Sequence, residues 1–175
     1  MAMMKNRKIE IMSPVGSFET LAAAINAKAD SVYFGIEQLN MRARAANNFT
    51  LEDLNKIAEI CKKNNIKSYL TVNTIIYDHD LKLMKKIVDA AKKTGITAVI
   101  ASDVATITYA HSKDVEVHIS TQANVSNIET IKFYSQYSDV VVLARELTMK
   151  QIKKICDEIK KQDIRGPSGE LIKVE

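Results

Sequence analysis

The chain has 175 residues, of which 46% are hydrophobic, and this is enough to bury one sizeable core. We expect a single domain over residues 1–175. The formal net charge of +4, from 25 Lys and Arg against 21 Asp and Glu, is too small to identify a nucleic-acid binder by charge. No apolar run suits a transmembrane helix and no secretory signal is visible, so we expect a cytoplasmic protein without a membrane partner.

Short β-rich runs alternate with amphipathic helices along the whole chain. The helices between the runs are predicted to begin or end at polar caps and glycines, namely Ser17, Thr50 with Asp53, Gly95, Asn127, and Thr148 with Gln151. In chain order, the strands are predicted at residues 8–12, 30–34, 67–72, 97–101, 115–119, 139–143 and 171–175.

This alternation predicts an α/β fold with a parallel sheet and right-handed crossovers. Two arrangements fit, an open doubly wound sheet and a (β/α) barrel of the TIM type. About six βα units plus a strand fall short of the eight that close a barrel. We therefore expect either an open sheet or an incomplete TIM-barrel-like domain, and favour the latter.

In both arrangements the ligand site lies beyond the carboxyl ends of the strands. The polar stretch at residues 118–127 marks such an end. Ser126 and Asn127 are explained as caps of the next helix, whereas Ser120, Gln122 and Asn124 come too early in the chain to be explained in this way. The candidate substrate-binding residues at the strand ends are Arg42, Arg44, Asn73, Asp103, Ser120, Gln122, Asn124, Arg145 and Glu146.

The arginines are informative because the chain is rich in lysine, and a guanidinium grips carboxylate or phosphate with two hydrogen bonds. We expect Arg42 and Arg145 to bind an anionic group, such as a small co-substrate. The alternative is that each pairs with a nearby acid, for instance Arg145 with Asp103 or Glu146.

No nucleophile with its own base is apparent, and no metal site is expected. A hydrolytic trio of Ser120, His118 and Asp103 is conceivable, because His118 and Ser120 share one face of a strand. However, two residues on the same strand are poorly placed for a nucleophile-to-base hydrogen bond. The two cysteines, Cys61 and Cys156, lie in helical patterns and are interpreted as buried structural thiols.

Five segments together resemble the N-terminal half of the collagenase-like peptidase family, which is family 32 of the peptidases of unknown catalytic type. They are SPVGSFETLAAAINAKADSVYFG, LNMRARAANNFTLEDL, YLTVNTIIYD, HISTQANVSN and VVLARELTMKQIKKI. The resemblance implies a part of a barrel. Its functional implications differ: some members act in hydroxylation of tRNA wobble uridine or rRNA, while the family was named for proteolysis.

The resemblance also implies cysteines that hold an iron-sulfur cluster and follow the position of Glu175, so this chain alone would lack them. We expect a truncated chain, a first function in RNA modification, and a peptidase as the alternative. A non-catalytic binding domain is a third possibility. The partners would be RNA or a peptide, and an open sheet edge would allow self-association.

Overall fold

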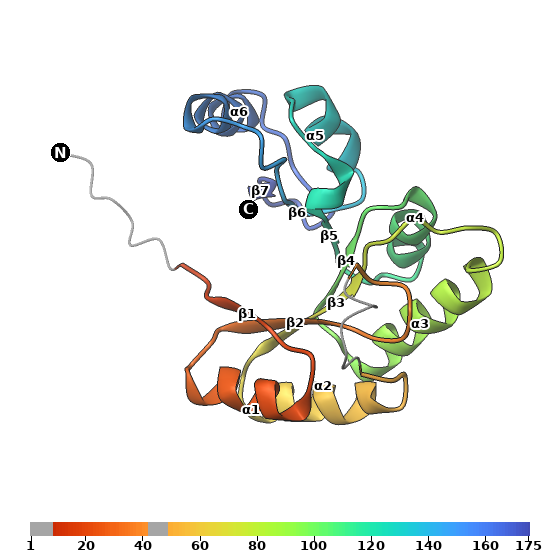
Figure 1. Ribbon diagram of the computed structural model, residues 1–175. Helices are drawn as coiled ribbons and strands as arrows, with labels where there is room; N and C mark the ends of the chain where they lie inside the picture. Colours follow the sequence, from red (N-terminus) through yellow and green to blue (C-terminus); the bar gives the residue numbers. More distant parts are fainter. Residues whose placement is uncertain (1–8, 42–48) are drawn as a thin grey trace.

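The computed structural model describes residues 9–41 and 49–175, and its centre is a curved parallel sheet of seven strands (Figure 1). The strands pair in sequence order from β1 to β7, with every pair parallel. In a doubly wound sheet the strand order reverses at a switch point. The uninterrupted order from β1 to β7 is therefore that of a barrel and not of a doubly wound sheet. The strands are β1 (Met12–Pro14), β2 (Ser31–Gly35), β3 (Lys67–Val72), β4 (Ala98–Ala101), β5 (Val117–Ile119), β6 (Val140–Val141) and β7 (Lys173–Val174).

The helices lie along the outer side of the curved sheet and leave its inner side open (Figure 1). The first and last strands, β1 and β7, do not pair with each other, so the sheet is a half-barrel. The expected incomplete TIM-barrel-like fold is confirmed. The helices are α1 (Phe18–Asn26), α2 (Asp53–Lys63), α3 (Leu81–Thr94), α4 (Val104–Ser112), α5 (Ile128–Tyr134) and α6 (Met149–Lys161), with a short 3-10 helix η1 (Thr121–Ala123).

The core fills the space between the sheet and these helices. Alternate residues of the strands point outward into it, as Leu70 and Val72 of β3 do, and both are at most 1% exposed. Ile57 and Ile87 from α2 and α3 are fully buried against them. The intervening residues of each strand therefore face the open inner side, which positions the polar groups described below.

Several predicted helix ends are confirmed. Ser17 caps α1 in a capping box with Thr20, and Thr148 caps α6 in a box with Gln151. Gly95 ends α3 with a left-handed φ of 76°, which glycine adopts without the steric cost of a Cβ. Each device satisfies backbone groups that the helix leaves without partners.

Other boundaries differ from the sequence analysis. The first strand begins at Met12, because the Ile11 N–H bonds the side chain of Asp30 instead of a neighbouring strand. Thr50 and Asp53 do exchange their predicted hydrogen bonds, yet α2 begins at Asp53. The later strands are shorter than predicted. For example, β5 begins only at Val117, because the Val115 N–H donates a hydrogen bond to Ala110 O at the end of α4.

Candidate functional site

Asn73 connects three segments at the carboxyl ends of the strands. It follows β3, and its Nδ2 donates to Ser120 Oγ after β5 at 3.3 Å. Its Oδ1 accepts the backbone N–H of Met41, in the connection after β2, also at 3.3 Å. The sequence prediction that Asn73 and Ser120 share one edge is borne out in this contact, and both side chains are used to hold the edge together.

Gln122 and Asn124 differ from this pair because both are exposed. Ser120 Oγ accepts the Gln122 N–H and so begins η1, and Asn124 ends it with a left-handed φ of 51°. Asparagine tolerates this conformation better than most residues. Within the described part of the chain neither side-chain amide has a hydrogen-bond partner, so both can reach a ligand.

Asp103 has a structural role at the same edge. Its Oδ1 caps α4 by accepting the Ala105 N–H at 2.8 Å, and its Oδ2 accepts the Ile76 N–H at 3.2 Å. The carboxylate thus joins the connection after β3 to the start of α4.

Arg145 and Glu146 follow β6 and are exposed. They lie beside the 118–127 segment, because the N–H of the preceding residue, Ala144, donates a hydrogen bond to Val125 O. Arg145 forms no salt bridge with any carboxylate of residues 9–41 or 49–175, so the alternative pairing with Asp103 or Glu146 is absent there. Arg42 and Arg44 lie outside the described residues.

The hydrolytic trio does not assemble. Ser120 Oγ is bonded to Asn73, Asp103 is bonded to two backbone N–H groups, and His118 Nε2 lies 2.9 Å from Glu116. His118 lies in β5 and Ser120 directly follows it, but the imidazole Nε2 is hydrogen-bonded to Glu116 and not to the Ser120 hydroxyl.

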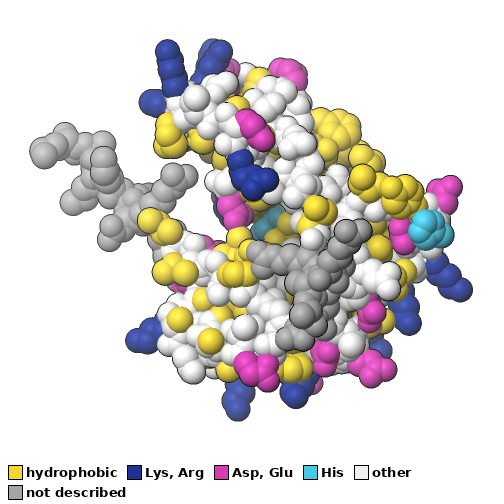
Figure 2. All heavy atoms as spheres, in the orientation of Figure 1, with side chains coloured by type: hydrophobic (Ala, Val, Ile, Leu, Met, Phe, Trp, Pro, Cys, Tyr) yellow, Lys and Arg dark blue, Asp and Glu magenta, His cyan; other side chains and the backbone are white. Residues whose placement is uncertain are grey.

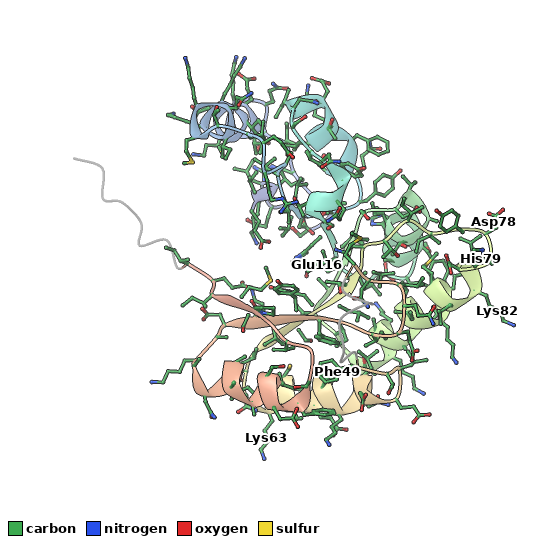
Figure 3. The ribbon with its side chains drawn as sticks, in the orientation of Figure 1. Phe49, Lys63, Asp78, His79, Lys82 and Glu116 are labelled. Atoms are coloured by element: carbon green, nitrogen blue, oxygen red, sulfur yellow. The ribbon has the colours of Figure 1, made fainter. Side chains whose placement is uncertain are left out.

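A cavity of about 230 Å³, which was not predicted from the sequence, lies on the inner side of the sheet. Figure 2 shows the molecule hollowed in this region, with charged side chains along the wall, and Figure 3 labels Glu116 on the inner side of the sheet. Both edge strands reach it, since Met12 of β1 and Lys173 of β7 are in its wall. The remaining lining residues are Glu10, Lys67, Tyr69, Glu116, His118, Val140 and Glu175.

Two hydrogen-bonded groups dominate this cavity. Glu10 accepts from Lys67 Nζ and from the Tyr69 hydroxyl, each at 2.6 Å. Burial alone would raise the pKa of Glu10, but hydrogen bonds, chiefly those from Lys67 and Tyr69, and the charge of Lys67 lower it to about 2. Glu116 is hydrogen-bonded to the buried His118, whose ring lies 4.9 Å from the ring of Tyr69.

The electrostatics of the cavity follow from these pairs. The hydrogen bond with His118 lowers the pKa of Glu116, with help from Lys173 and Lys67. Burial and the neighbouring Glu10 carboxylate raise the pKa of the Tyr69 phenol. The phenol therefore stays protonated and donates its hydrogen bond to Glu10. Burial raises the pKa of Glu175; His118 opposes this shift and Glu10 adds to it.

The cysteines and acids do not form a metal site within the described ranges. Cys61 on α2 is 1% exposed, and burial raises the pKa of its thiol to about 11. Cys156 on α6 is only half-buried, which corrects the prediction that both thiols are buried. No helix in residues 9–41 and 49–175 is long and apolar enough to cross a membrane.

A model of peptidase family U32 matches residues 16–165. The chain belongs to this family. The half-barrel is also similar to a solved structure of a U32 peptidase, with a TM-score of 0.70 over 89% of this chain and 68% of that chain. At 12% identity, that similarity concerns the fold.

Two curated relatives of this U32 chain differ in function. A collagenase of Porphyromonas gingivalis is 61% identical over 95% of this chain and 40% of its own length. The tRNA hydroxylation protein P1 of Bacillus subtilis is 30% identical over 87% of this chain and 37% of its own length. The chain thus spans about 40% of the length of these relatives. The higher identity to the collagenase favours the peptidase alternative over RNA modification, which was the first function predicted from the sequence.

Proposed function

We propose that the protein containing this U32 chain acts on polypeptides as a collagenase-like peptidase, and that the carboxyl edge of the half-barrel holds the substrate. The observation that carries the proposal is the 61% identity, over 95% of the chain, to a collagenase. The exposed amides of Gln122 and Asn124 suit a peptide, because a carboxamide can both donate to a backbone C=O and accept from a backbone N–H.

Asn73 and Ser120 have a supporting role in this proposal. Their mutual hydrogen bond fixes the turn from which Gln122 and Asn124 project. Ser120 Oγ is hydrogen-bonded to Asn73 and to the Gln122 N–H, and not to a histidine or carboxylate base as nucleophilic hydrolysis requires, while the Thr50 hydroxyl that donates to Asp53 belongs to the N-terminal cap of α2. We therefore assign substrate binding to this chain and expect the reacting groups elsewhere in the longer protein.

The test uses the purified protein at its natural length and fluorescently labelled, denatured collagen. We expect cleavage, with a KM that rises several-fold in Gln122→Ala and Asn124→Gly while kcat changes less, because binding contacts are removed. Glycine at position 124 keeps the left-handed turn. Gln136→Ala, an exposed amide after α5, is the matched control. Absence of cleavage by the wild-type protein would refute the proposal.

RNA modification is the second candidate, supported by the relative named as a tRNA hydroxylation protein and by the finding that Ser120 is hydrogen-bonded to Asn73 and not to a base. In this case Arg145, with Arg42 and Arg44, would hold an anionic substrate or co-substrate. Mass spectrometry of tRNA from a deletion strain tests it. Unchanged wobble-uridine hydroxylation would exclude a tRNA role.

An iron-sulfur cluster does not fit the cysteines of this chain. Cys61 and Cys156 lie on different helices, and the raised pKa of Cys61 keeps it as a thiol, whereas cluster ligands are thiolates. Any cluster in the longer protein would need cysteines outside these 175 residues.

A further inference from the structure

Exposed apolar side chains gather on the carboxyl edge of the half-barrel, on the connections that follow β2, β3 and β4. They are Met41, Ile75, Tyr77 and Val104, and each is more than half exposed. We call this set the apolar rim. Apolar patches on a protein surface commonly mark a binding site, because their exposure to water is unfavourable. The carboxyl edge is also the face at which barrel enzymes bind their substrates.

The apolar rim is a fixed part of the structure. Asn73 Oδ1 accepts the Met41 N–H at 3.3 Å, and Asp103 Oδ2 accepts the Ile76 N–H at 3.2 Å. These two hydrogen bonds tie together the connections after β2, β3 and β4. Val104 directly follows Asp103 at the start of α4. The apolar side chains are therefore held in exposed positions by the hydrogen bonds of the backbone that carries them.

The rings of Tyr77 and His79 are stacked beside each other in the connection after β3. Their centroids lie 5.7 Å apart, and their planes differ by 4°. Asp80 holds the turn that carries both rings, because its Oδ2 accepts the Tyr77 N–H at 3.2 Å and its own N–H donates to Tyr77 O at 2.8 Å. Figure 3 labels His79 in this turn, between β3 and α3. The pair forms a flat, preformed aromatic surface.

We propose that the apolar rim binds a proline-rich, extended stretch of the polypeptide substrate, and that the stacked rings of Tyr77 and His79 contact a proline ring. This inference rests on the proposed peptidase function and names the substrate feature that the edge selects. Aromatic surfaces recognise proline-rich chains in the polyproline II conformation, which is also the conformation of collagen chains. A relative that is 61% identical to this chain is named as a collagenase.

The distance along the edge sets the length of this stretch. Asn73 and Tyr77 are four positions apart in the sequence, so they are separated by at most about 14 Å. A polyproline II chain advances about 3.1 Å per residue, so about five residues reach from the Tyr77 ring to Asn73. The exposed Gln122 lies beside Asn73, since Ser120 Oγ bonds both Asn73 and the Gln122 N–H. One short peptide can therefore contact the rings and the amides together.

The binding experiment uses the protein at its natural length and the fluorescence anisotropy of labelled, blocked peptides. One peptide consists of Pro-Pro-Gly repeats, and the other has alanine in place of every proline. We expect saturable binding of the proline peptide, about fivefold or more tighter than that of the alanine peptide.

Tyr77→Ala should weaken binding of the proline peptide about three- to tenfold, whereas Tyr77→Phe, which keeps the ring, should not. Phe133→Ala, which removes an exposed aromatic ring from α5, is the matched control and should leave binding unchanged. Equal thermal melting of the variants establishes that they are folded. Equal affinity for the two peptides, or equal binding by Tyr77→Ala and Phe133→Ala, would overturn the inference.

Two further outcomes separate this inference from its alternatives. Tighter binding of an oligouridylate that Tyr77→Ala abolishes would make the apolar rim an RNA-binding surface and overturn the inference. Binding of the proline peptide without cleavage of denatured collagen would refute the peptidase function, while the apolar rim would remain a site for proline-rich chains. Cleavage of collagen without selection of proline would refute the inference alone.

Chemical modification tests the position of the site without a substitution. Tetranitromethane nitrates exposed tyrosines, so Tyr77, which is 59% exposed, should react in the native protein of natural length, and the proline peptide should protect it. Tyr69, at 4% exposure, is the unreactive internal reference. Peptide mapping by mass spectrometry measures both. Failure of Tyr77 to react without peptide would show that another part of the longer protein covers the apolar rim, and would overturn the inference.

Discussion

Asn73 donates a hydrogen bond to Ser120 across 47 positions of sequence, with 3.3 Å between Nδ2 and Oγ. The same side chain accepts the Met41 N–H, so one amide ties together the segments that follow β2, β3 and β5. This part of the half-barrel edge consequently depends on a single side chain.

Asn73→Ala should lower the free energy of unfolding by about 1–3 kcal/mol, because the Met41 N–H and the Ser120 hydroxyl both lose a partner. Urea denaturation measures the change. Asn55→Ala removes an exposed amide from the surface of α2 and should not destabilise the protein. Equal stability of the two variants would mean that water replaces both hydrogen bonds.

Gly35→Ala should destabilise the protein by about 1–3 kcal/mol, because a Cβ at this position would overlap the side chain of Asn40. Asn40 is 2% exposed and donates to Ile36 O and Glu37 O, so it cannot move without losing hydrogen bonds. In a double-mutant cycle, Asn40→Ala should relieve part of the Gly35→Ala cost. Strict additivity would show that the overlap is avoided in another way.

The low pKa of Glu10 predicts a specific loss of stability in acid. The pKa is lowered from 4.5 to about 2 in the folded chain, so its stabilising contribution is present above about pH 4.5 and is lost as pH falls toward 2. The side chain is 36% exposed, and with solvent screening we expect a contribution of about 1 kcal/mol.

Glu10→Gln should remove this part of the pH dependence, while the control Glu59→Gln should retain it. Urea denaturation at a series of pH values compares them. A curve for Glu10→Gln that parallels the wild type below pH 4.5 would contradict the assigned pKa.

Cys156 should react with iodoacetamide much faster than Cys61 in the native protein. Cys61 is 1% exposed and its raised pKa of about 11 leaves little thiolate at neutral pH, whereas Cys156 is half-buried. Peptide mapping by mass spectrometry measures both rates. In denaturant the difference should disappear, which serves as the internal control.

The sequence predicted those parts of the fold that depend on neighbouring residues. The strand at 67–72, the N-cap at Ser17, the capping box at Thr148 and the glycine end at Gly95 are local chemistry, and the structure has all of them. The common edge of Asn73 and Ser120 was also predictable, because parallel strands end on the same side.

The inner cavity was not predicted because it depends on the curvature of the sheet. Glu10 accepts a hydrogen bond from Tyr69, which lies 59 positions away in the sequence, and no local sequence pattern predicts a contact between residues so far apart. A signal was nevertheless present. Lys67 and Tyr69 in β3, like Glu116 and His118 before and in β5, place polar groups at alternate positions of strands whose other residues are apolar.

The sequential order of the strands also affects how the chain can assemble during synthesis. Each strand pairs with the one translated just before it, so no strand has to wait for a distant partner. Each new βα unit can dock as it leaves the ribosome, and the growing sheet always presents its newest strand as the pairing edge. Assembly by addition of one unit at a time keeps the entropic cost of each loop closure small.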